Sequence, residues 1–144
     1  MEPTNASLYG KGVFTTIAIG DGSPFLWENH WRRLSVNAET IGIDLTNYSK
    51  SVVADALAVS INEDQITNGR ARITFSDERP SATWPRESSD STKLSIITGG
   101  IRAIPNNFKL DVSPYPVNSL SPLAGVKSCN YLENLMAMDD AKTS

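Results

Sequence analysis

The sequence has 144 residues, of which 40% are hydrophobic and 20% charged, and its net charge is −3. This balance predicts a soluble globular protein of one domain, or of one domain and part of another, and it argues against nucleic acid or an anionic membrane as a partner. One cysteine excludes an internal disulfide framework and suits a cytoplasmic location, while one histidine leaves little material for a metal site or a Ser-His-Asp triad.

The first elements in the chain are a predicted strand pair and a predicted helix. β-branched and aromatic residues dominate Val13 to Ile19, so we expect a strand there and a short partner strand over Pro24 to Leu26 after a Gly-Asp-Gly turn. Apolar residues then recur every three or four positions, at Trp27, Trp31, Leu34, Ala38 and Ile41. This spacing predicts a helix with one apolar face that ends at Gly42.

A second helix is expected to begin at a cap formed by Thr46 or Asn47 and to run to about Ile61. Its apolar residues are Val52, Val53, Ala56, Leu57 and Val59. Strict alternation follows, with the polar residues Arg70, Arg72 and Thr74 between the apolar residues Ala71, Ile73 and Phe75. Such alternation predicts a strand with one polar and one apolar face.

Turn-forming residues divide the rest of the chain. Asp77 to Asp90 predicts a long exposed hairpin loop, and two further strands are expected over Lys93 to Thr98 and Phe108 to Val112. Pro114 to Pro122 is rich in proline and serine, which is typical of a linker. A last helix, capped by Ser128 or Asn130, is expected to reach the end of the chain.

These elements predict an α+β fold in two layers. We expect a small N-terminal domain over residues 1–113 with a mainly antiparallel sheet and two helices, then a linker over 114–122. The start of a second domain is expected over 123–144, and its last helix has no sheet to pack on, so we expect this domain to be incomplete here.

Three segments contain the candidate chemical residues. Leu123 to Asn134 sets Lys127 just before the last predicted helix, and a lysine amine in a pocket between domains can become neutral and form a Schiff base with an aldehyde. Leu8 to Thr16 contains Tyr-Gly-Lys-Gly-Val-Phe-Thr-Thr, and His30 to Leu34 reads His-Trp-Arg-Arg-Leu. Together these segments resemble the class IV aminotransferase superfamily, whose members bind pyridoxal 5'-phosphate.

The resemblance implies roles for named residues. Lys127 would carry the cofactor as an internal aldimine and then move the proton at the α carbon of the substrate. Arg33 would hold the cofactor phosphate, for which a permanently charged planar fork is suited, and Tyr131 would lie near the phenolic oxygen of the cofactor. No metal is implied. Members of the family are generally homodimers with sites near the subunit interface, so a homodimer is expected.

The substrate pocket is expected to include Tyr9, Phe14, Thr15 and Arg72. Without the resemblance, purely structural roles stay open for these residues. Tyr9, Phe14 and Tyr131 could be aromatic side chains of the core, and Arg33 and Arg72 could be surface or rim residues. His30 is interpreted as structural and Cys129 as a buried residue without chemistry.

The function implied is transfer of an amino group between a small amino acid and a 2-oxo acid. The alternative within the family is 4-amino-4-deoxychorismate lyase, which releases pyruvate and 4-aminobenzoate on the folate route, because Phe14-Thr15-Thr16 and Pro122 to Lys127 look like lyase segments. A further alternative is a non-catalytic fragment with an assembly role. An acid for the pyridinium nitrogen and a second phosphate-binding turn have no match in these 144 residues, so we expect them alone to be inactive.

Overall fold

The structure is a computed structural model, and it describes residues 2–81 and 91–143. Its elements in chain order are α1 (Asn5–Tyr9), β1 (Gly12–Gly20), β2 (Ser23–Pro24), α2 (Trp27–Thr40), α3 (Lys50–Glu63), β3 (Gly69–Asp77), β4 (Thr92–Gly100) and α4 (Leu132–Thr143). The predicted mixed α/β fold with an antiparallel sheet is confirmed.

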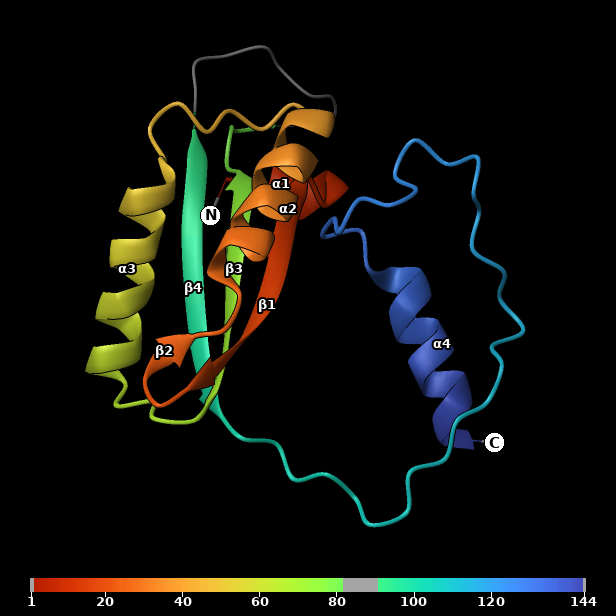
Figure 1. Cartoon of the computed structure of the whole chain (residues 1–144). Coiled ribbons are helices and arrows are strands. Elements are labelled where there is room, and N and C mark those ends of the chain that lie inside the picture. The colour runs from red at the N-terminus through yellow and green to blue at the C-terminus, as the bar shows by residue number, and fades with distance from the viewer. Residues whose placement is uncertain (1, 82–90, 144) are drawn as a thin grey trace.

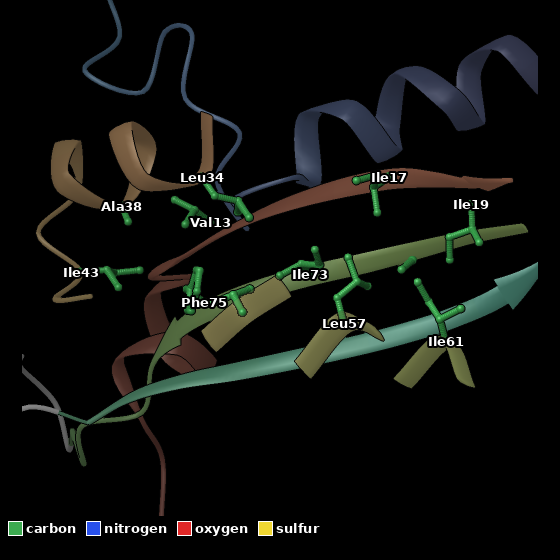
Figure 2. Packing of buried hydrophobic residues seen from close by; sticks show 12 residues of the cluster. Val13, Ile17, Ile19, Leu34, Ala38, Ile43, Leu57, Ile61, Ile73 and Phe75 are labelled. Atoms are coloured by element: carbon green, nitrogen blue, oxygen red, sulfur yellow. The ribbon is translucent and has the colours of Figure 1, made fainter. Parts of the chain in front are cut away.

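The sheet has the strand order β2-β1-β3-β4, and every neighbouring pair is antiparallel. Helices α2 and α3 cover one face of it, as Figure 1 shows. The core lies between these two layers and is drawn in Figure 2. Its buried members are Val13, Ile17, Ile19, Leu34, Ala38, Ile43, Val53, Leu57, Ile61, Ala71, Ile73 and Phe75.

The alternation predicted for β3 is confirmed. Ala71, Ile73 and Phe75 are fully buried on the helix-covered face, whereas Arg70 and Arg72 are exposed on the other face. Successive side chains of a strand point to opposite faces, so the hydrophobic set selects which face the helices cover.

Helix α2 has the predicted apolar face, but α3 begins later than predicted. The hydroxyl of Thr46 binds the Asp44 carboxylate at 2.5 Å, which forms a local turn, and Ser49 caps α3 instead by accepting a hydrogen bond from the backbone of Val52. Val52 and Val59, expected on the apolar face, are about half exposed.

Two predictions on the second half were wrong. Residues 108–112 form no strand, because Phe108, Leu110 and Val112 are at least 71% exposed and no neighbouring strand offers them backbone partners. Helix α4 begins at Leu132 without a cap from Asn130, whose side chain lies against Gly10 instead. None of the α4 residues is buried.

Some features were not predicted or lie outside the described residues. Helix α1 was missed, and it ends at Gly10 with a left-handed φ of 63°. Most of the predicted loop from Asp77 to Asp90 lies outside the description, although β3 and β4 pair as the hairpin requires. From β4, at one edge of the sheet, the chain runs as an extended segment to the other edge, next to β1 (Figure 1).

Candidate active site

The backbone of Lys127 is attached to the outer edge of β1. Its carbonyl accepts a hydrogen bond from the amide of Phe14 at 3.0 Å, and the amide of Cys129 donates to the carbonyl of Gly12 at 2.8 Å. Ser128 and Val13 form the β-bridge between these bonds. A residue late in the chain is thereby held in register against the first long strand.

The amine of Lys127 lies over two aromatic rings. Its nitrogen is 4.5 Å from the ring centroid of Phe14 and 3.4 Å from the hydroxyl oxygen of Tyr131. The two rings meet edge to face at 5.2 Å, and the guanidinium carbon of Arg72 lies 3.7 Å from the Phe14 centroid on the same face of the sheet. The ring of Phe14 therefore makes cation–π contacts with both Lys127 and Arg72.

Arg33 belongs to a second group on the helix-covered face. Its guanidinium donates to the hydroxyl oxygen of Thr15 at 2.5 Å, and that oxygen lies 2.7 Å from Nδ1 of His30. Burial, with the charge of Arg33 as the second cause, lowers the pKa of His30 below its ordinary value of 6.5. A neutral imidazole can accept a hydrogen bond from the Thr15 hydroxyl, so this hydroxyl can donate to His30 while it accepts from Arg33.

The predicted site residues thus form two groups on either side of β1. Lys127, Tyr131, Phe14 and Arg72 make one group, because Phe14 points away from the covered face. Arg33 and Thr15 make the other, since the next residue of a strand points the opposite way. Tyr9 is in neither group: it is 38% exposed at the end of α1.

His30, which the sequence predicts to be structural, contacts the second group through the hydroxyl of Thr15. It lies three positions before Arg33 on α2, and residues three apart share a face of a helix, so the spacing was a usable signal. Its contact with Thr15 could not be predicted from the sequence, because that contact joins a helix to a strand.

Close packing beside Lys127 explains one glycine. A Cβ on Gly12 would lie 2.8 Å from the sulfur of Cys129 and 3.1 Å from the carbonyl oxygen of Phe75. Burial raises the pKa of the Cys129 thiol, and the nearby Arg72 opposes this rise. The thiol therefore acts as packing between β1 and the lysine segment.

On the two sides of β1, these residues offer the types of group that pyridoxal phosphate would bind. An amine, a phenol and a guanidinium are the partners that an aldehyde, a phenolic oxygen and a phosphate need. Across residues 2–81 and 91–143, neither Lys127 nor Arg33 belongs to an ion pair that would compete with such groups. Within the same ranges, no cluster of three metal-ligating side chains occurs, and no helix is long and apolar enough to span a membrane.

Comparison with known proteins by sequence finds a matching family and a similar protein. The model of the family described as amino-transferase class IV matches residues 12–144. A protein of Methanocaldococcus jannaschii, named as a putative branched-chain-amino-acid aminotransferase, is 29% identical over 90% of this chain and 46% of its own length.

Two solved structures share the fold. The 4-amino-4-deoxychorismate lyase of Pseudomonas aeruginosa aligns with a TM-score of 0.79 and 22% identity, over 94% of this chain and 50% of that one. The branched-chain amino acid aminotransferase of Escherichia coli aligns with a TM-score of 0.70 and 19% identity, over 92% and 47%. The chain spans about half the length of the relatives it matches.

Proposed function

The chain belongs to the class IV aminotransferase family, and we propose that it contributes the lysine half of a pyridoxal-phosphate site to an enzyme that moves an amino group between a small amino acid and a 2-oxo acid. The observation that carries the proposal is the position of the Lys127 amine, on the ring of Phe14 and 3.4 Å from the Tyr131 hydroxyl. A lysine held by its backbone on a strand edge has a defined direction of attack.

Each residue has a proposed task. When bound, the cofactor supplies an electron sink for the pair that remains when the α proton of the substrate leaves. Lys127 would hold the cofactor at its aldehyde carbon, with release of water, and once the amine of the substrate has displaced it, the free Nζ would accept and return that proton. Tyr131 orients the cofactor by a hydrogen bond, and Arg33 holds its phosphate. Phe14 excludes water from one side of the amine.

The remaining parts of the proposal concern the whole protein. Because the chain spans about half the length of its relatives, we propose that further polypeptide completes the site and supplies the acid that the family resemblance implies for the pyridinium nitrogen. We propose a homodimer in the cytoplasm, in keeping with the family resemblance and with a single cysteine.

The test is borohydride trapping. The purified chain is mixed with pyridoxal phosphate and reduced, and the labelled lysine is identified by mass spectrometry. We expect label at Lys127, less label in Arg33→Ala, and unchanged label in the control Lys109→Arg, which alters an exposed lysine in an extended segment. Label scattered over the lysines, or none, would overturn the proposal and favour an assembly role for the chain.

A second candidate is 4-amino-4-deoxychorismate lyase. It is favoured by the Phe14-Thr15-Thr16 segment, in which Thr15 is buried beside Arg33. Both reactions use Lys127, so that residue does not separate them. Release of pyruvate from aminodeoxychorismate without an oxo-acid acceptor would establish the lyase and exclude the transaminase, and the assay is run on the chain together with its completing polypeptide.

A further inference from the structure

The hydroxyl of Thr15 joins two side chains that come from the same helix. Its oxygen accepts from the guanidinium of Arg33 and lies 2.7 Å from Nδ1 of His30. His30 and Arg33 are three positions apart on α2, so they lie on the same side of that helix. Within residues 2–81 and 91–143, the Thr15 hydroxyl has no other side-chain partner, so its orientation depends on these two neighbours.

The donors and acceptors of this group fit together in one way. A guanidinium has donors only, so the Thr15 oxygen must accept from Arg33. The single proton of the hydroxyl is then directed to another neighbour, and Nδ1 of His30 is within reach as the acceptor. Nδ1 also lies 3.4 Å from the Arg33 nitrogen, so a proton on Nδ1 would face a cationic donor. The fitting form of His30 is therefore the neutral ring with its proton on Nε2.

Arg33 depends on this group for its direction. It is an exposed residue, and in the described part of the chain its side chain has hydrogen-bond contacts with Thr15 and His30 alone. None of the described ion pairs includes it. A long exposed side chain loses rotamer freedom when it binds a ligand, and this loss weakens binding. A contact that orders Arg33 beforehand reduces the loss.

We propose that His30 is a positioning residue that directs Arg33 through the Thr15 hydroxyl. By accepting a hydrogen bond from Thr15, His30 turns the oxygen lone pairs toward Arg33. One nitrogen of the guanidinium is then fixed, while its other N–H groups stay available for an anion. The inference rests on the proposed function, because it takes that anion to be the phosphate of the cofactor. His30 acts on the phosphate only through its two neighbours.

The test compares two aldehydes that differ by the phosphate alone. Pyridoxal phosphate and pyridoxal are each titrated into the chain, borohydride is added, and the fraction of labelled Lys127 gives a half-saturating concentration for each. Their ratio measures how much the phosphate contributes. We expect His30→Leu to reduce the ratio about fivefold, as the net loss of one hydrogen bond would give. His30→Asn should retain most of it, because Oδ1 of asparagine is as many bonds from the backbone as Nδ1 of histidine.

A double variant tests whether His30 acts through Thr15. Thr15→Val already removes the acceptor of Arg33, so adding His30→Leu to it should reduce the ratio no further. Glu39→Leu makes a polar-to-apolar change at an exposed position farther along α2 and should leave the ratio unchanged.

The opposing outcomes are distinct. An unchanged ratio in His30→Leu, an equal loss for both aldehydes, or a further loss in the double variant would overturn the inference, and an equal loss would mean that His30 only stabilises the fold. Absent labelling of Lys127 in the wild-type chain would instead overturn the proposed function, and this inference with it.

Discussion

The hydroxyl oxygen of Thr15 lies 2.5 Å from a guanidinium nitrogen of Arg33. Thr15 is fully buried on β1, whereas Arg33 is an exposed residue of α2. A buried strand residue therefore restrains the direction of an exposed arginine, and it does so without neutralising the charge. This is the arrangement expected of an arginine that is kept available for an anion.

Replacement of Thr15 by valine tests this relationship. Valine keeps the shape but cannot accept the hydrogen bond, so we expect the affinity for pyridoxal phosphate to fall about tenfold, the loss of one hydrogen bond to a charged group. The measurement is the fraction of Lys127 trapped by borohydride as a function of cofactor concentration. Thr16→Val alters the exposed neighbour and should have no effect; an equal loss in both variants would contradict the restraint.

His30 predicts a pH dependence of stability. Because burial and Arg33 lower its pKa in the folded protein, the unfolded chain binds the proton first as the pH falls below 6.5. The stabilisation from the neutral imidazole is complete above that pH and is lost on acidification through the lowered pKa. Urea unfolding at several pH values should show this loss between pH 7 and the acidic range.

The chain has one histidine, which makes the control simple. His30→Gln removes the titrating group, so the difference in unfolding free energy between wild type and variant should shrink as the pH falls. A difference that is constant with pH would show that His30 does not titrate in this way.

Gly12→Ala tests the packing beside the lysine. The added Cβ would lie 2.8 Å from the sulfur of Cys129, so the 127–129 segment must move away from β1. We expect about 1–3 kcal/mol of destabilisation, as for overpacking, and reduced trapping at Lys127. Gly20→Ala, where no atom lies within 4 Å, serves as the control. Unchanged trapping in Gly12→Ala would mean that the lysine does not depend on this contact.

The ion cluster at Asp77 predicts a stabilising role for the N-terminal segment. Burial alone would raise the pKa of Asp77, but hydrogen bonds from Arg79, Lys11 and Asn5 outweigh it and hold the pKa well below its ordinary value of 3.8. The amide of Asn5 also donates to the carbonyl of Arg79 at 3.0 Å. The cluster thereby joins α1 to the end of β3.

Asp77→Asn should therefore lower the free energy of unfolding by about 2–3 kcal/mol near neutral pH, since two partly buried cations lose their carboxylate. The folded-state pKa is lowered, so this stabilisation is present above pH 3.8 and is lost as the pH falls further. Asp139→Asn removes an exposed pair with Lys142 and should cost at most about 1 kcal/mol. Equal effects in urea unfolding would contradict the role of the cluster.

Much of the fold follows from local pattern. The alternation around Ile73 has the period of a strand, and the spacing of Leu34 and Ala38 has the period of a helix. Each pattern gives its element one apolar face, and the two faces pack together in the core. The strand predicted over 108–112 is absent from the structure because it has no neighbouring strand. Strand-forming residues form a strand only where a neighbour supplies hydrogen bonds, and local sequence does not reveal that neighbour.

For the site, the sequence by itself predicts which residues would bear chemistry, because its motifs point to Lys127, Arg33 and Tyr131. Only the tertiary structure decided how they are arranged. Pairing of residues 127–129 with β1 is a long-range backbone contact, and the division of Phe14 and Thr15 between the two faces depends on strand register. Register is set by the buried face of the whole sheet, so no short segment contains it.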